Sequence, residues 1–468
     1  MSDVVQVARA RAPVALADAA RRRMADARSV VDEVIAKNEP AYGLTTGFAE
    51  RKRVQIDPES RAQFNRLAIL NARVGQGDPV PVDVARAAML CLVNGFGRGT
   101  STARPEIADA VVSALNQGFE PVIRRLGSVG QADFVLMADL AHELIGHGYV
   151  DPVVGDAVAL FDNNSVSTGW GALALADCVS LLDTLDAAAA LDLEAFGANL
   201  SILHPVVADS RGHPGIRQTI DRLREQLDGS SLWATGAARN LQDPLSFRCL
   251  PQVHGAMRDA LDFAAGIVVT ELNSFQGNPA VSVHDRRVVS IANFDALPLA
   301  AALDFVRVLL ASVLTSANER MLKLLQAPLS GLPSGLSVAP GLAEAGFSEI
   351  GVAGQAITVE ARTLAHPVSY EMASSTQAEG VEDRTAMASL SARRLAEMVE
   401  LGQRLLTIEL VVAAQAVDLR SAPALGHGVQ RTRDLVRSCV SFMNQGAPVP
   451  QDLEPLRALV HSGRFIDR

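Results

Sequence analysis

Two side chains in this sequence have settings that suit chemistry on a small carboxylate. Tyr42 is one of three tyrosines, and Gly43 and Gly47 place it in a loop whose backbone can approach a ligand. A phenol with its ordinary pKa near ~10 is a poor base at neutral pH unless donors or a cation stabilise the phenolate. Arg248 carries a planar guanidinium that suits bidentate pairing with a carboxylate. The alternative readings are a tyrosine ring that only packs and an arginine in a structural ion pair.

The elements that must position these residues are predicted to be helices. Ala and Leu dominate a chain that is 49% apolar and 4% aromatic, a composition that favours close helix packing. Apolar residues recur at three- and four-residue spacing and predict helices over 255–272, 296–325, 348–364 and 384–419. We expect an all-α fold with an N-terminal helical and loop domain over 1–180 and a long-helix bundle domain over 181–468.

Charge and composition exclude several kinds of partner. The formal charge of -10 and the pI near 5.5 argue against nucleic acid, which requires concentrated Lys and Arg. The apolar stretch 297–314 contains Asp304 and Arg307, so it is predicted to be a core helix and not a membrane span. No apolar segment of signal-peptide type occurs near the N-terminus, and we expect a cytoplasmic protein.

The cysteines give no sign of a metal site or a disulfide framework. They are scattered and form no CxxC pair, so we expect buried thiols and no bound metal. The four positions are Cys91, Cys178, Cys249 and Cys439.

Short motifs along roughly 340 residues occur in an order that resembles the aromatic amino acid ammonia-lyases, the family of histidine and phenylalanine ammonia-lyase. Each motif alone is weak, and their order is specific. The family's fold implies an all-α homotetramer with a core of long central helices and active sites assembled from loops of different subunits. The motifs are Tyr42 to Phe48, Gly127 to Gly130, Gln242 to Pro244 with Ser246 and Arg248, Pro251 to Val253, Glu271, Asn278-Pro279, Asn293-Phe294, Glu319-Arg320, Leu364 to Pro367 and Glu382-Asp383.

The resemblance fails at the tripeptide from which the family makes its prosthetic group, methylidene-imidazolone. Family members cyclise and dehydrate Ala-Ser-Gly directly after Gly-Ser-Val-Gly. Here the three positions are Gln131, Ala132 and Asp133, so no serine hydroxyl can be eliminated and the ring nitrogen would belong to Asp133. We therefore expect no prosthetic group and no other cofactor.

The resemblance assigns roles to several remaining residues. Tyr42 matches the base that takes a proton from the carbon next to the one bearing nitrogen, and Arg248 matches the arginine that binds the substrate carboxylate. Gln242 and Phe294 fit as pocket lining, whereas Leu245 occupies the position of a second active-site tyrosine.

Three further positions bear on the substrate. Glu382 aligns with the family's acidic residue near the substrate head group, and Glu379 competes for this role because the loop is about two residues longer than usual. Asp162 replaces an asparagine, which either adds negative charge to the pocket or reflects a one-residue slip toward Asn163. Asn71 and Ala72 stand where the family reads the substrate ring. Because this pair has no histidine, a histidine substrate is not expected.

The leading hypothesis is a lyase that eliminates an amine without the prosthetic group. A quaternary trimethylammonium is already a good leaving group and has no N–H or lone pair to add to an electrophile. The family contains such a branch, resembling ergothionase, which expels trimethylamine from a betaine. Tyr42 would be the base, Arg248 would bind the carboxylate, and Glu382, Glu379 or Asp162 would face a cationic head. The alternatives are a catalytically inactive binding scaffold and a cyclase or isomerase that uses the same tyrosine.

Overall fold

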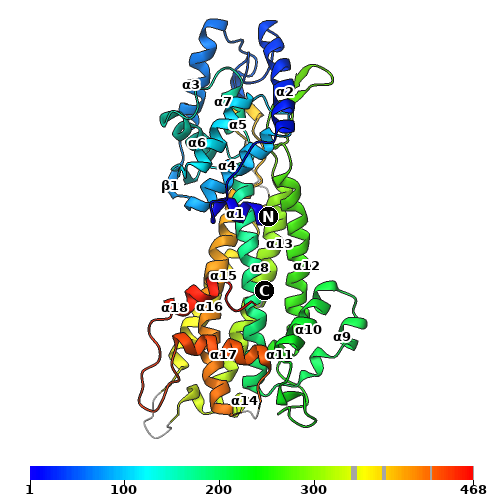
Figure 1. Ribbon diagram of the computed structural model, residues 1–468, viewed down its shortest axis with the longest axis vertical. Coiled ribbons are helices and arrows are strands. Elements are labelled where there is room, and N and C mark those ends of the chain that lie inside the picture. Colours follow the sequence, from blue (N-terminus) through cyan, green and yellow to red (C-terminus); the bar gives the residue numbers. More distant parts are fainter. Residues whose placement is uncertain (339–344, 371–375, 422–423, 467–468) are drawn as a thin grey trace. The chain divides into compact units, whose positions relative to one another are not determined.

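The computed structural model describes residues 1–338, 345–370, 376–421 and 424–466 (Figure 1). Helices dominate this part of the chain, which confirms the predicted all-α class. The named strands form two short antiparallel pairs, β1 (Gln76–Pro79) with β2 (Arg124–Leu126) and β3 (Ala280–Ser282) with β4 (Arg287–Val289).

The chain folds into two compact units, and each unit is made of three segments. Unit 1 contains residues 1–176, 264–304 and 367–393, and unit 2 contains residues 177–263, 305–366 and 394–468. The division is therefore not a single cut near residue 180. Each of four long helices contributes residues to both units: α8 (Ser165–Phe196), α12 (Leu250–Leu272), α13 (Leu297–Leu324) and α16 (Ala388–Arg420).

Unit 1 carries the medium-length helices and glycine-rich loops of the N-terminal region. Val30, Val31 and Leu44 belong to one of its apolar clusters and are fully buried. Besides its parts of the long helices and the four strands, unit 1 contains α1 (Ser2–Ala8), α2 (Asp18–Ala36), η1 (Ala49–Arg51), η2 (Pro58–Ser60), α3 (Arg61–Ala72), α4 (Val82–Phe96), α5 (Pro105–Asn116), α6 (Phe134–Gly146), α7 (Asp156–Phe161) and η7 (Ala378–Gly380).

Unit 2 is a helical bundle with shorter helices along its sides. Close packing is visible at Gly402 of α16, where an added Cβ would lie 2.7 Å from Leu181 of α8 and 3.2 Å from Leu314 of α13. The unit's other elements are η3 (Leu200–Leu203), α9 (Val206–Asp209), α10 (Pro214–Gln226), η4 (Ser231–Trp233), α11 (Leu245–Arg248), α14 (Ala327–Ser330), η5 (Ser334–Leu336), α15 (Ser348–Leu364), α17 (His427–Cys439) and α18 (Glu454–His461).

The long helices lie close to where the apolar spacing predicted them. The prediction of 348–364 coincides with α15, and that of 296–325 exceeds α13 by one residue at each end. The helix expected over 255–272 begins earlier, at Leu250, directly after α11. The helix expected from 384 begins at Ala388, because the segment before it binds the 127–130 loop through hydrogen bonds from the N–H groups of Ala386 and Met387 to the Val129 carbonyl.

Helix α13 is long and apolar enough to cross a membrane by length and composition alone. The two charged side chains in its apolar stretch, Asp304 and Arg307, form hydrogen bonds with other protein groups. Asp304 is 4% exposed and accepts hydrogen bonds from the N–H groups of Val368 and Ser369 and from the Ser391 hydroxyl. Arg307 is fully buried and donates to the carbonyls of Leu364 and His366. These contacts support the prediction of a core helix.

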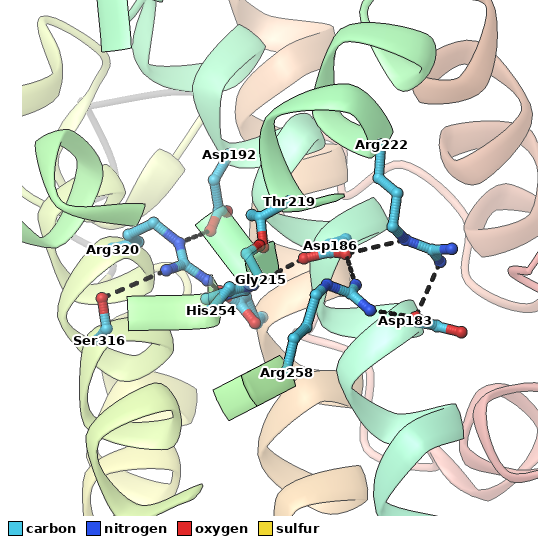
Figure 2. Close-up of polar contacts among 11 residues, drawn as sticks. Asp183, Asp186, Asp192, Gly215, Thr219, Arg222, His254, Arg258, Ser316 and Arg320 are labelled. Atoms are coloured by element: carbon cyan, nitrogen blue, oxygen red, sulfur yellow. Dashed lines mark hydrogen bonds and ion pairs between the residues drawn. The ribbon is translucent and has the colours of Figure 1, made fainter. Parts of the chain in front are cut away.

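A buried ionic network joins the helices of unit 2 (Figure 2). Arg320 of α13 pairs with Asp192 of α8 and Glu409 of α16, each at 2.8 Å, and all three side chains are fully buried. Arg258 of α12 pairs with Asp186 of α8. Removing one partner of such a pair leaves an uncompensated charge in the interior, which is strongly destabilising.

His254 adds a titratable group to this network. Its Nδ1 lies 2.7 Å from Asp186 Oδ1, whereas its Nε2 is buried without a hydrogen-bond partner. Burial lowers the pKa of His254, and the hydrogen bond and charge of Asp186 act against this. Burial alone would raise the pKa of Asp186, but His254 and Arg258 outweigh it and the pKa is lowered. The folded protein therefore holds a neutral imidazole that donates to an ionised carboxylate.

This arrangement predicts a loss of stability in mild acid. Because the unfolded chain binds a proton at His254 below about pH 6.5 and the folded chain resists it, the free energy of unfolding should fall by up to about 1.4 kcal/mol per pH unit below that point. Replacing His254 with asparagine, which can still donate to Asp186, should flatten the profile. Urea unfolding from about pH 7.5 to 5 tests this, with His284→Asn at a 97% exposed side chain as the control. Identical slopes in both variants would contradict it.

Candidate active site

Tyr42 lies in a tight loop of unit 1 that its own backbone holds in place. The Ala41 carbonyl accepts hydrogen bonds from the N–H groups of residues 44–46 at 3.0 to 3.1 Å. Gly43 has a φ of 70°, and a Cβ at this position would lie 2.4 Å from the Phe48 ring. The positive φ and this close approach favour glycine, so Gly43 lets the chain turn directly after Tyr42.

The phenol itself is held from two sides. Its Oη accepts a hydrogen bond from the Ala49 N–H at 3.0 Å. Its ring meets the Phe48 ring edge to face, with centroids 5.5 Å apart, and Phe48 in turn contacts Phe161 at 5.5 Å. These contacts place the tyrosine loop against the end of α7, which is followed directly by Asp162.

The charges around Tyr42 are negative. Burial is the largest cause that raises its pKa, and the carboxylates of Asp162, Glu382 and Glu50 raise it further, while the hydrogen bond from Ala49 lowers it. A phenol that must act as a base at neutral pH needs the opposite influence. In this environment Tyr42 is held in its protonated form.

Asp162 follows α7 and is 8% exposed. Burial raises the pKa of its carboxyl group well above the ordinary value, Glu382 raises it further, and a hydrogen bond with Asn278 lowers it. The Asn278 Oδ1 accepts the Ile291 N–H at 2.9 Å, so the amide is oriented with its NH₂ group available to Asp162. Gly277 permits this approach, because a Cβ there would lie 2.6 Å from the Asp162 carbonyl oxygen.

Asn163, the other candidate at this position, forms hydrogen bonds with backbone groups. Its Nδ2 donates to the carbonyls of Ala159 and Leu160 at 3.0 and 3.2 Å, and its Oδ1 accepts the Ser165 N–H at the start of α8. Of the two residues, Asp162 interacts with Tyr42 and Glu382, whereas Asn163 links the end of α7 to the start of α8.

Glu382 and Glu379 have different environments. Glu382 is partly buried, and burial followed by the neighbouring Asp383 raises its pKa. Glu382 pairs with Gln377 in an isolated antiparallel β-bridge, in which the Gln377 N–H donates to the Glu382 carbonyl at 2.7 Å. Glu379 is exposed and has a φ of 56° in the turn between them. The structure therefore brings Glu382, and not Glu379, into the group with Tyr42 and Asp162.

The segment Gln131, Ala132 and Asp133 does not fit the prosthetic group of the resembling family. Ala132 has no hydroxyl, has a φ of 60°, and contacts the Phe294 carbonyl through its N–H at 3.4 Å. The Asp133 N–H, which would have to close the ring, donates to the Asn163 carbonyl at 2.8 Å. The Gln131 Nε2 is buried and has no hydrogen-bond partner. No step of a mechanism can be assigned to methylidene-imidazolone here.

Asp133 has a structural task of its own. Its carboxylate accepts hydrogen bonds from the Ser128 hydroxyl at 2.9 Å and from the Ser167 N–H and hydroxyl at 2.6 and 2.5 Å. Burial raises its pKa, and these hydrogen bonds, with a further one from the Val166 N–H, lower it. The carboxylate thus satisfies N–H groups at the start of α8 and fastens the 128–133 loop to that helix.

The other candidates of unit 1 lie as follows. Phe294 contacts the 128–133 loop through its backbone. Its carbonyl accepts hydrogen bonds from the Asn164 Nδ2 at 2.7 Å and from the Ala132 N–H. Asn71 is exposed on α3, and Ala72 is the buried last residue of that helix. No interaction ties either of these two side chains to Tyr42 among the described residues.

A second group of candidates lies in unit 2. The Arg248 Nη1 donates to the Gln242 Oε1 at 3.0 Å, and its Nε is buried without a partner. No carboxylate of the described chain lies within ion-pair distance of this guanidinium, so it is available to an external carboxylate. Leu245, at the start of α11, is 61% exposed and presents an apolar surface.

Sequence reasoning missed the roles of Asn278 and Asp133. The sequence marks Asn278 only as part of an Asn-Pro motif. The glycine before it, Gly277, is the feature that indicates a close backbone approach at this point. At Asp133 the sequence indicates only that the family's glycine is absent. The described residues contain no group of three or more His, Cys, Asp and Glu that could hold a metal ion. Cys91 and Cys178 are buried, and burial raises the pKa of Cys91 to about 12.

Sequence comparison finds relatives whose similarity extends over the whole chain. The family model described as aromatic amino acid lyase matches residues 1–155 and 150–438. A histidine ammonia-lyase from Stigmatella aurantiaca is 34% identical, and the match covers 100% of this chain and 96% of the relative. A histidine ammonia-lyase from Treponema denticola is 31% identical with the same coverage.

Solved structures agree with the sequence match. Ergothionase from Treponema denticola, an ergothioneine-degrading enzyme solved with desmethyl-ergothioneine sulfonic acid, superimposes with a TM-score of 0.94 at 25% identity and covers 100% of this chain and 98% of its own. Tyrosine aminomutase from Streptomyces globisporus gives a TM-score of 0.92 at 26% identity, with coverage of 99% and 95%.

Proposed function

The chain belongs to the aromatic amino acid lyase family, and we propose that it eliminates an amine from a cationic, amino-acid-derived carboxylate without methylidene-imidazolone. Its relatives identify it as a carbon–nitrogen lyase. The observation that carries the proposal is the combination of Tyr42, Asp162 and Glu382 with a 131–133 segment that has no hydroxyl to eliminate.

The acidic residues near Tyr42 indicate which kind of leaving group the site would accept. Two acidic side chains near the base, Asp162 and Glu382, suit a substrate whose nitrogen carries a positive charge, because a cation beside them favours their ionised forms. A quaternary trimethylammonium leaves as a neutral amine, so it requires no electrophile to make it a better leaving group. We therefore propose a betaine, and the similarity to ergothionase supports this class of substrate.

The proposed reaction is a 1,2-elimination. Tyr42 takes a proton from the carbon adjacent to the nitrogen-bearing carbon, the C–H electron pair becomes the second bond of a C=C double bond, and the C–N pair leaves with the amine. Arg248 binds the substrate carboxylate through its guanidinium. The products are an unsaturated carboxylate, a neutral amine and a proton.

We also propose that the protein is a homotetramer, with sites completed by residues from different copies. Unit 2 exposes large apolar side chains along its long helices, as a self-associating surface requires. They are Phe263 of α12 at 55%, Phe305 and Val308 of α13 at 45% and 42%, and Val352 and Val359 of α15 at 60% and 56%.

A substrate panel tests the function directly. Purified protein should release trimethylamine from at least one amino-acid betaine and produce the absorbance of a conjugated double bond in equal amount. The parent amino acids, which have a poor leaving group, serve as matched controls and should not react. Binding of betaines without release would favour the inactive scaffold, and a rearranged product that keeps its nitrogen would favour an isomerase or a cyclase.

A further inference from the structure

Arg320 of α13 belongs to the fully buried part of the ionic network in unit 2 (Figure 2). Its Nε donates to Asp192 Oδ2 and its Nη2 donates to Glu409 Oε1, each at 2.8 Å. The N–H bonds of Nε and Nη2 lie parallel on one edge of the guanidinium and often bind the two oxygens of a single carboxylate. Here that edge binds oxygens of two different side chains, so the two carboxyl groups lie directly beside each other.

Charge balance distinguishes this pair of carboxyl groups from its neighbours in the network. Asp183 and Asp186 also share one guanidinium edge, that of Arg222, but Arg258 pairs with both of them and supplies a second positive charge. The two carboxyl groups at Arg320 have no second guanidinium within ion-pair distance in the described part of the chain. If both were ionised, this fully buried group would carry a net negative charge, which is costly in the interior.

The same two carboxyl groups also lack a hydrogen-bond donor. Asp192 Oδ1 and Glu409 Oε2 are buried and have no hydrogen-bond partner. The Nη1 of Arg320 is directed elsewhere, to the Ser316 hydroxyl at 3.4 Å. Two ionised carboxylates can only accept, so neither can satisfy the other. A single proton on either group makes it a donor to its neighbour and reduces the net charge of the buried group to zero.

We propose that Asp192 and Glu409 share one proton at neutral pH and form a buried proton-binding site in unit 2. Arg320 neutralises the remaining carboxylate, and the protonated carboxyl donates to it. The influences on Asp192 agree, since burial raises its pKa well above the ordinary value and Glu409 raises it further, while Arg320 lowers it. His254 does not take this proton, because burial and the charge of Arg320 lower its pKa.

A shared proton makes folding depend on pH. The unfolded chain loses this proton near the ordinary carboxyl pKa values of about 4, whereas the folded chain keeps it, so folding takes up about one proton per chain. The stabilisation is complete in acid and is lost as the pH rises through the folded pKa. Over this range the folding equilibrium weakens by about tenfold per pH unit. Below about pH 6.5 the contribution of His254 has the opposite sign, so the window from about pH 7 to 8.5 suits the measurement.

Amide variants test the proposal, because an amide resembles a protonated carboxyl group. Asp192→Asn can accept from Arg320 and donate to Glu409, and Glu409→Gln can do the same in the opposite direction. Each variant should fold, with an unfolding equilibrium at neutral pH within about tenfold of the wild type. In urea unfolding each should lose the dependence of about tenfold per pH unit that the wild type shows. Infrared spectra at about pH 7.5 should contain one protonated-carboxyl band fewer in each variant.

Asp183→Asn is the matched control, since Asp183 also lies on α8 and contacts arginines but belongs to the charge-balanced part of the network. It should retain the pH dependence and the infrared band. The double variant Asp192→Asn with Glu409→Gln removes both counter-charges of Arg320 and should be strongly destabilised. Equal pH dependence in the wild type and either single amide variant would overturn the inference. So would an infrared band that persists, or failure of either single variant to fold.

Discussion

Replacing Tyr42 with phenylalanine is expected to lower turnover of a betaine substrate by about 10²- to 10⁴-fold, the usual contribution of a positioned acid or base. The ring can remain against Phe48, and the main structural loss is the acceptor of the Ala49 N–H, worth about 1 kcal/mol. The melting temperature should therefore change little. The measurement is kcat for both proteins with one substrate, beside their thermal unfolding curves.

Arg248→Ala should produce a different defect from Tyr42→Phe. Losing a charged partner for the substrate carboxylate is expected to raise KM by roughly one to two powers of ten. Arg248→Lys keeps the charge without the planar fork and should recover only part of this loss. A wild-type rate in Tyr42→Phe would refute the mechanism while leaving the family assignment intact.

Mixing these two variants, at a substrate concentration well below the KM of Arg248→Ala so that both are slow, tests whether sites are shared between copies. If Tyr42 and Arg248 of one site come from different chains, tetramers reassembled from equal amounts of Tyr42→Phe and Arg248→Ala contain some intact sites. Random assortment predicts up to about a quarter of wild-type turnover. If both residues of a site come from one chain, no chain in the mixture has both, and the mixture should be no faster than the average of the two variants measured separately.

Restoring the family tripeptide as Gln131→Ala, Ala132→Ser and Asp133→Gly is expected to destabilise the protein by about 2–5 kcal/mol. The Asp133 carboxylate accepts from the Ser128 hydroxyl and from the N–H and hydroxyl of Ser167, and the two Ser167 donors are fully buried and would be left unpaired. Denaturant unfolding measures the loss. Asp133→Asn, which keeps one acceptor oxygen and the side-chain shape, is the matched control and should lose much less.

Intact mass spectrometry completes this experiment. The wild-type chain should have the mass of its unmodified sequence, since Ala132 has no hydroxyl to eliminate. A wild-type mass lowered by the water lost in cyclisation and dehydration would contradict the reading of the 131–133 segment. Equal stability of the triple variant and the wild type would show that Asp133 does not support the start of α8.

The sequence predicted the helices well because their apolar spacing is a local property. The long helices near 296–325 and 348–364 follow from this spacing alone. The grouping of Tyr42 with Asp162 and Glu382 does not, because these residues belong to three segments far apart in the chain. In the sequence, only the family resemblance connects them.

The choices that the sequence left open depended on backbone direction. Glu379 and Glu382 have the same chemistry, and the turn with a φ of 56° at Glu379 decides which of them is partly buried. Asp162 and Asn163 are adjacent, and the end of α7 decides between them, because the Asn163 amide is used by the backbone there. The sequence contains the residues in both cases but not the directions of their side chains.

The three-segment composition of unit 1 has a consequence for synthesis on the ribosome. Residues 1–176 cannot complete this unit until residues 367–393 have been made. At about 5–20 residues per second, roughly 20–70 s separate the synthesis of Tyr42 from that of Glu382. During this interval the apolar faces of the early helices lack their late partners, so the nascent chain is expected to need chaperones, and a chain truncated before residue 367 should aggregate and not yield a smaller folded domain.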